Sequence, residues 1–226
     1  MKIVLISTYE MGRQPFGLAS PAAWLKNAGF DVVCLDLCVQ ALEPAAVADA
    51  DLIALHVPMH TATRIATAVL DRLKAVSPEA HLCAYGLYAP VNAEFLRKRG
   101  VDTILGGEFE DGLMNLAYRI ASTRFSADSK GSGRESEIGH VLPLLIQLEP
   151  EISLARQRFV VPDRSSLPPL AKYAHLELPD GTNRTAGYVE ASRGCKYLCR
   201  HCPVVPVYNG QFRIVQREVV LGDIRQ

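Results

Sequence analysis

Between residue 1 and about residue 120, short apolar runs alternate with segments whose apolar residues recur at helical spacing. This alternation is typical of a parallel β-sheet with helices on its faces. The apolar runs predict five strands, at residues 2–8, 31–38, 51–57, 81–85 and 102–105. Joined by right-handed crossovers, they form a doubly wound α/β sheet of the Rossmann or flavodoxin kind.

Local signals place the helices between these strands. The first helix is expected from Ser20, as N-cap, to Asn27, with Pro21 in its first turn and Gly29 after its end. Further helices are expected at 61–76 and 92–99, and a last one, opened by Gly106-Gly107-Glu108, runs to residue 120.

The pattern stops after residue 121. Residues 126–139 are rich in Ser, Gly and charge, which is typical of a linker, and the prolines of residues 140–186 indicate an extended connector. A new strand is expected at 186–191, directly before a group of cysteines. The chain therefore divides into a first domain at 1–122, a linker and connector at 123–185, and the start of a second domain at 186–226.

Charge and targeting signals narrow the class of protein. The 226 residues contain 24 Lys and Arg against 24 Asp and Glu, so net charge gives no reason to expect a nucleic acid or an anionic membrane as a partner. We find no secretory signal and no uncharged apolar run of about 18 residues, which a membrane-spanning helix requires. A cytoplasmic location is expected.

Six cysteines in a cytosolic chain do not indicate a disulfide framework. Cys34, Cys38 and Cys83 fall in apolar strands and are expected to be buried thiols. The other three follow one another in a CxxxCxxC spacing: Cys195, Cys199 and Cys202. Clustered thiolates select iron-sulfur clusters or zinc.

The number of ligands separates these two metals. A zinc site normally needs four protein ligands, and His201 is too close in sequence to Cys202 to share the metal with correct geometry. Three cysteines on a four-iron cluster leave one iron open to a small molecule. A structural zinc site and inert thiols remain as alternatives.

The segment Ser192-Arg193-Gly194-Cys195-x-x-x-Cys199-x-x-Cys202 resembles the radical S-adenosylmethionine signature. The resemblance implies that the three cysteines bind a [4Fe-4S] cluster whose open iron chelates S-adenosylmethionine. An electron, from a reductant such as flavodoxin or ferredoxin, then cleaves it to a 5'-deoxyadenosyl radical that abstracts hydrogen. His201 stands where the family usually has an aromatic residue near the adenine.

Other segments extend the resemblance over most of the chain. Residues 212–225 resemble the stretch leading into the first barrel helix, and residues 162–173 resemble the connector of the cobalamin-binding branch. A (β/α) barrel needs on the order of 200 residues, whereas about 40 follow residue 186. The chain therefore looks like an N-terminal part with an incomplete barrel. A subgroup named for a Cys-Cys-Ala-Glu-Pro or selenocysteine-containing tail is a further suggestion of the resemblance.

In that branch the corrinoid lies across the carboxyl ends of the strands, the usual ligand edge of an open α/β sheet. The candidate cofactor residues there are Tyr9, His60, Gly86, Gly106, Gly107 and Glu108. Some of these residues, and others near this edge, have simpler interpretations. Tyr9, Trp24 and Tyr85 also suit core or rim packing, Glu108 and Glu110 also suit a helix N-terminus, and His56 and His60 also suit structural roles.

The chain lacks an Asp-x-His-x-x-Gly segment, so cobalamin ligated by a histidine of that motif is not expected. The resulting hypothesis is a cobalamin-type radical S-adenosylmethionine enzyme that performs C–H activation or methyl transfer. Its substrate and catalytic residues are not readable from this sequence. The rival hypothesis is a non-catalytic Rossmann-like module that binds a corrinoid or another small ligand and has a structural zinc loop.

Overall fold

A computed structural model describes residues 1–129 and 149–226, without the side chains of residues 125–129. Its main sheet has six parallel strands in the order β2-β1-β3-β4-β5-β6. Their bounds are β1 Lys2–Ser7, β2 Asp31–Asp36, β3 Leu52–His56, β4 His81–Tyr85, β5 Thr103–Gly107 and β6 Ile152–Ser153. The doubly wound α/β fold is confirmed. The expected count of five strands is one too low, because two residues of the connector add β6 at the edge.

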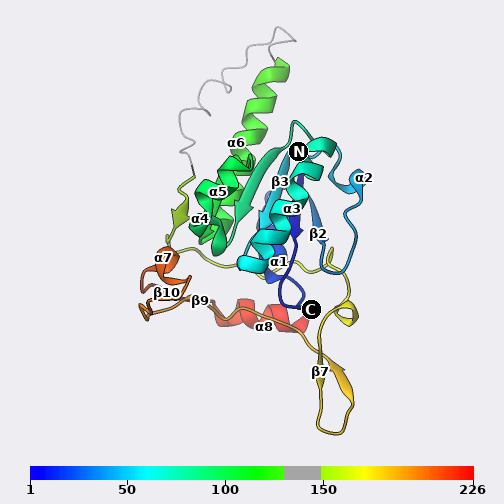
Figure 1. The fold of residues 1–226 in the computed structure, drawn as a ribbon, viewed down its shortest axis with the longest axis vertical. Coiled ribbons are helices and arrows are strands. Elements are labelled where there is room, and N and C mark those ends of the chain that lie inside the picture. Colours follow the sequence, from blue (N-terminus) through cyan, green and yellow to red (C-terminus); the bar gives the residue numbers. More distant parts are fainter. Residues whose placement is uncertain (130–148) are drawn as a thin grey trace.

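Helices cover both faces of this sheet: α1 Phe16–Asn27, α2 Pro44–Val47, α3 His60–Val76, α4 Tyr88–Val91, α5 Ala93–Lys98 and α6 Phe109–Ser129. Alternate residues of β1 enter two separate cores, with Val4 and Ile6 on one face and Ile3 and Leu5 on the other. The first core includes side chains of α3 and α5, and the second includes side chains of α1 and α6. In Figure 1, α3 crosses in front of the sheet and α1 lies behind it.

Helix α1 begins at Phe16, so the prediction that Ser20 caps it is wrong. Pro21 instead lies inside the helix. Because proline has no N–H, the carbonyl of Gly17 receives no helical hydrogen bond from position 21. The hydroxyl of Tyr85 donates to that carbonyl at 2.7 Å. The Ser20 hydroxyl is likewise engaged away from a cap, since it donates to Glu110 at 2.6 Å.

Helix α6 continues to Ser129, past residue 122, where the first domain was expected to end. The predicted linker at 126–139 overlaps this helix at 126–129, and its remainder lies outside the described residues, as do residues 140–148. Residues 149–185, within the predicted connector, form only short elements. These are β6, a 3-10 turn at Leu170–Lys172, and a hairpin of β7 His175–Glu177 and β8 Asn183–Thr185.

The prediction of a strand at 186–191 is wrong, since no strand forms there. In this segment the Tyr188 carbonyl accepts from Arg164, and the Ala191 carbonyl accepts from the N–H of Val215. A strand forms directly after this segment, where β9 Ser192–Gly194 pairs antiparallel with β10 Phe212–Ile214. Two helices complete the chain, α7 Val205–Tyr208 and α8 Arg217–Arg225. Figure 1 shows β9, β10, α7 and α8 lying across the carboxyl ends of the sheet strands.

The prediction of buried thiols is confirmed for two of the three cysteines placed in strands. Cys34 and Cys83 are buried, whereas Cys38 is exposed. The prediction for Cys38 is wrong because β2 ends at Asp36, and the following residues turn away from the sheet. Burial also raises the pKa of the Cys34 thiol to about 11.

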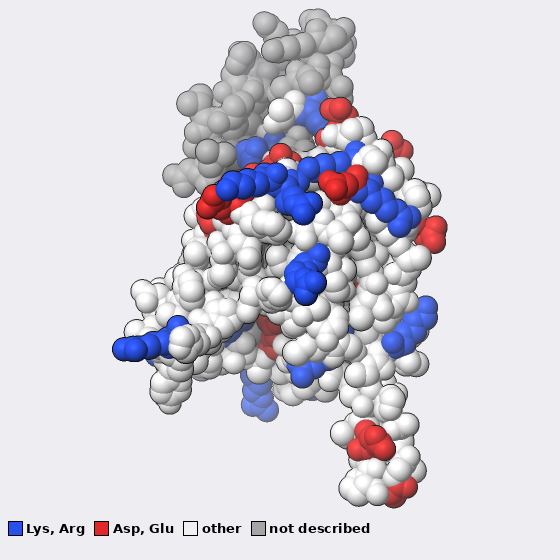
Figure 2. All heavy atoms as spheres, viewed as in Figure 1, with Lys and Arg blue, Asp and Glu red and all other residues white. Residues whose placement is uncertain are grey.

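Charged side chains of both signs are interspersed on the face shown in Figure 2, mainly toward the end at which the strands begin. Some form surface ion pairs, such as Lys98 with Glu94 and Arg97 with Glu151. Among the described helices, none has the length and hydrophobicity that a membrane crossing requires.

Candidate functional site

A cavity of about 370 Å³ opens at the carboxyl ends of the strands. One wall comes from the sheet domain, with residues that follow β1, β3, β4 and β5. The other wall comes from the segment that contains β9 and α7. The lining residues are Glu10, Met11, Gly17, His56, Pro58, Met59, Gly86, Leu87, Gly107, Phe109, Tyr188, Glu190, Ser192, Arg193, Gly194, Val204 and Tyr208.

Of the predicted cofactor residues, Gly86 and Gly107 line this cavity. The remaining five lie outside its lining. Tyr9 is half-buried, His60 and His201 are exposed, and Gly106 and Glu108 are buried. Their assignment to a cofactor stays a prediction.

Gly107 shows what the expected glycine turn does. Its φ is +70°, and a Cβ there would lie 2.1 Å from the carbonyl oxygen of Ser153. The close backbone approach that glycine permits is therefore to β6. The Glu108 N–H donates to the same carbonyl at 2.8 Å, which fixes the start of α6 against the edge strand.

His56 ends β3 inside the cavity wall and is only 5% exposed. Its Nδ1 lies 3.2 Å from Oε2 of Glu10, and neither atom has a hydrogen bond within the described part of the chain. The imidazole packs beside Tyr85 and Phe109, with ring centroids 5.2 and 6.2 Å away. Only glycine fits at position 17 of α1, where the helix packs on this ring, since a Cβ there would lie 2.0 Å from Cε1 of His56.

Arg193, which leads into the cysteine loop, is buried in the opposite wall. It donates to Glu110 at 2.5 and 2.7 Å, to Glu108 at 3.3 Å and to Glu190 at 3.2 Å. Its guanidinium carbon also lies 5.0 Å from the ring centroids of Phe109 and of Phe159. These contacts join the segment before Cys195 to the turn between β5 and α6.

The carboxylates around Arg193 differ in their protonation. Burial raises the pKa of Glu108 to about 7, with the Arg193 attraction opposing the shift and the Glu110 charge adding to it. Burial acts on Glu110 in the same direction. However, the shorter contacts from Arg193, with hydrogen bonds from Ser20 and Gln157, hold the Glu110 pKa below its usual value. Glu110 is therefore the ionised partner of Arg193, whereas the raised pKa of Glu108 means that it gains and loses its proton near neutral pH.

The cysteine loop is accessible. Cys199 is exposed, and Cys195 and Cys202 are half-buried. The N–H of Cys195 donates to the Gln211 carbonyl at 3.1 Å, and that of Cys202 to the Cys199 carbonyl at 3.3 Å. In the described part of the chain, no three His, Cys, Asp or Glu side chains are arranged to hold a metal ion. Three thiols are suitable ligands for an iron-sulfur cluster. In this structure, however, the three cysteines are not arranged around a common metal position.

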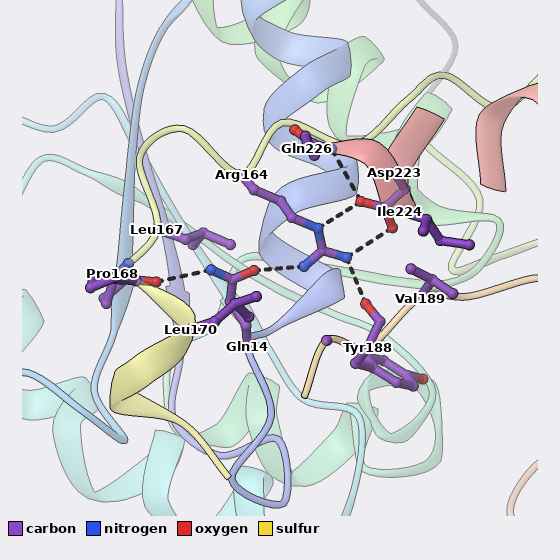
Figure 3. Close-up of a pocket in the computed structure, with 12 residues that line it drawn as sticks. Gln14, Arg164, Leu167, Pro168, Leu170, Tyr188, Val189, Asp223, Ile224 and Gln226 are labelled. Atoms are coloured by element: carbon purple, nitrogen blue, oxygen red, sulfur yellow. Dashed lines mark hydrogen bonds and ion pairs between the residues drawn. The ribbon is translucent and has the colours of Figure 1, made fainter. Parts of the chain in front are cut away.

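A second cavity, of about 650 Å³, lies between the connector and α8 and shares Tyr188 with the first. Figure 3 shows Arg164 at its wall, bidentate to Asp223 at 2.6 and 2.8 Å and donating to Gln14 and to the Tyr188 carbonyl. The amide of Gln14 is occupied in turn by Pro168. Because these polar groups bind one another, their role here is to join the connector, α8 and the loop after β1.

A comparison of the sequence with protein families fits this cavity at the carboxyl ends of the parallel strands. The family model described as B12 binding domain matches residues 2–117, about half of the chain. The chain belongs to this family. In the B12 binding domain of this chain, α1 to α5 and all five strands that the sequence predicts lie inside the matched range.

Two solved structures resemble nearly the whole chain. Both are of TsrM, a radical S-adenosylmethionine methyltransferase from Kitasatospora setae. The structure with cobalamin and a [4Fe-4S] cluster has a TM-score of 0.63 at 16% identity, covering 98% of this chain and 46% of that chain. The structure with tryptophan and an S-adenosylmethionine analogue has a TM-score of 0.59 at 14% identity, covering 99% and 44%. No curated protein matches the chain.

These likenesses establish the fold. The chain spans less than half the length of the TsrM chains. The sequence predicts residues 8–16 at the ligand edge, and Glu10 of that range lines the cavity, whereas Arg193, Glu190 and Tyr208 are not predicted there. Arg193 stands within the cysteine motif, which was a usable signal, whereas Tyr208 is brought in by contacts that leave no local pattern.

Proposed function

We propose that the chain binds cobalamin at the carboxyl edge of its sheet and forms part of a cobalamin-type radical S-adenosylmethionine enzyme. One observation carries the proposal. The B12 binding domain and the segment directly before Cys195 line the same cavity, and a buried ion pair from Arg193 to Glu110, with a longer contact to Glu108, holds them together. Two cofactors bound by these two parts would therefore lie close to each other.

The residues at this edge suit a large flat ligand. Gly86 and Gly107 lie in the cavity wall where β4 and β5 end, and the apolar side chains of Met11, Met59 and Leu87 in the same wall offer contacts to such a ligand. When bound, cobalamin supplies a cobalt centre that can carry a methyl group. The chain's part is to hold this cofactor and to keep Arg193 and the glutamates out of water.

The three cysteines would hold a [4Fe-4S] cluster, which when bound supplies the electron that cleaves S-adenosylmethionine. The loop is anchored on both sides. Arg193 binds Glu110 before it, and after it the Tyr208 hydroxyl donates to the Gly107 carbonyl at 3.2 Å. The exposed residues between these anchors are free to bring the three thiols together when iron and sulfide are present.

Cobalamin binding is tested with hydroxocobalamin by equilibrium dialysis. Met59 lines the cavity at the start of α3, and Met59→Trp fills part of it, so we expect the affinity to fall at least about tenfold. Ile65→Trp adds the same ring at an exposed position of the same helix and serves as the control. Equal affinities of these two variants would reject the cavity as the cobalamin site.

The cluster is tested by anaerobic reconstitution with iron and sulfide, an absorbance spectrum and an iron count. We expect Cys199→Ala to lose the iron-sulfur absorption and Cys38→Ala, which removes another exposed thiol, to keep it. Stoichiometric zinc with no iron-sulfur absorption would instead favour the rival, a non-catalytic binding module with a structural cysteine loop.

A further inference from the structure

His56 has Glu10 as a polar neighbour but makes no hydrogen bond to the described residues. Buried polar groups are almost always hydrogen-bonded, yet neither ring nitrogen of His56 has a hydrogen bond within the described residues, and Nδ1 is fully buried. Nε2 is not fully buried. This imidazole lies in the cavity wall and is 5% exposed, and its Nε2, which has no hydrogen bond to the described residues, can act as a metal ligand.

Glu10 sets which nitrogen is available. Its Oε2 lies 3.2 Å from Nδ1, so a proton on Nδ1 faces a carboxylate and the lone pair is left on Nε2. Metal-binding histidines in proteins usually point their other ring nitrogen at a carboxylate in this way, which fixes the tautomer and makes the imidazole a stronger donor.

The ring orientation is fixed as well. A Cβ on Gly17 would lie 2.0–2.4 Å from Cε1, Nε2 and Nδ1, and a Cβ on Gly86 would lie 3.1 Å from Cδ2. The imidazole therefore occupies the space that side chains at these two positions would take. Its contact with Tyr85, at 5.2 Å between ring centroids, supports it from the sheet.

We propose that Nε2 of His56, oriented by Glu10, is the protein ligand of the cobalt in a bound corrinoid. This inference rests on the proposed cobalamin site and deepens it. The ligand would come from the end of β3, and the chain needs no Asp-x-His-x-x-Gly segment for it. The step is the formation of one coordinate bond from the Nε2 lone pair to cobalt, with no bond broken and no change in oxidation state.

The test uses cob(II)inamide, a corrinoid without the benzimidazole nitrogen that cobalamin itself carries, bound to the unmodified chain and measured by electron paramagnetic resonance. We expect each cobalt line to split into three through one axial ¹⁴N. Labelling only the histidines with ¹⁵N should turn the three lines into two, which needs no variant and therefore does not depend on one folding. Bound cob(II)inamide without this splitting would overturn the inference, whereas no binding at all would overturn the proposed function.

Variants then identify the histidine. His56→Gln should lose the splitting, and His175→Gln, at an exposed position of the β7–β8 hairpin, should keep it. Loss of the splitting in His60→Gln, with the splitting retained in His56→Gln, would assign the bond to the neighbouring histidine and overturn the inference. If Glu10 orients the ring, Glu10→Gln should weaken cob(II)inamide binding about 10-fold or more, and unchanged affinity would remove Glu10 from the proposal.

Discussion

Arg193 has a buried guanidinium whose charge is balanced mainly by Glu110, in a contact between residues 83 positions apart. Removing one partner of a buried ion pair leaves the other uncompensated, which costs about 3–5 kcal/mol. We therefore expect Arg193→Gln to lower the free energy of unfolding by about that amount in urea denaturation. Arg97→Gln breaks an exposed pair with Glu151 and should cost less than about 1 kcal/mol. Equal losses in the two variants would contradict the account of Arg193.

Glu108 should make the free energy of unfolding depend on pH. Its pKa is raised to about 7 from 4.5, so between these values the folded chain binds a proton that the unfolded chain releases. The free energy of unfolding should therefore fall as pH rises from about 5 to 7, by up to about 3 kcal/mol. Glu108→Gln should lack this fall, so its advantage over the unmodified chain should grow with pH in urea titrations. Parallel pH profiles for the two proteins would show that Glu108 is ionised throughout.

At the scale of elements, Gly17 lets α1 pack closely against the His56 ring at the end of β3. Gly17→Ala directs a methyl group at the His56 ring, and overpacking of this kind costs about 1–3 kcal/mol. We expect a lower melting temperature for Gly17→Ala than for Gly187→Ala, since nothing lies within 4 Å of a Cβ at Gly187 and its φ is unstrained. Equal melting temperatures would mean that the ring moves aside without cost, and its fixed orientation would have to be abandoned.

The elements also show what the sequence can predict. Strands β1 to β5 are predicted to within about two residues, because strands buried on both faces read as continuous apolar runs. The start of α1 is missed because the hydroxyl of Ser20, a good capping group, is bound to Glu110 across the core. Strand β6 is missed because two residues, Ile152 and Ser153, give no periodicity to detect.

At the scale of the molecule, the cysteine motif and the ligand edge of the sheet are readable from sequence, but their contact is not. That contact depends on long-range pairs such as Arg193 with Glu110 and Tyr208 with Gly107, whose members carry no mutual signal along the chain. The same limit applies to the second cavity, where Arg164 meets Gln14 and Asp223 from distant segments. The described residues thus form two cavities that adjoin at Tyr188, and we assign the corrinoid to the one at the strand ends.

A crystal structure of the chain with hydroxocobalamin, with cobalt located by its anomalous scattering, tests this assignment most directly. The account predicts cobalt at the carboxyl ends of the strands, beside His56 and between Gly86 and Tyr208. Cobalt in the cavity beside Arg164, or on the surface away from both cavities, would contradict it.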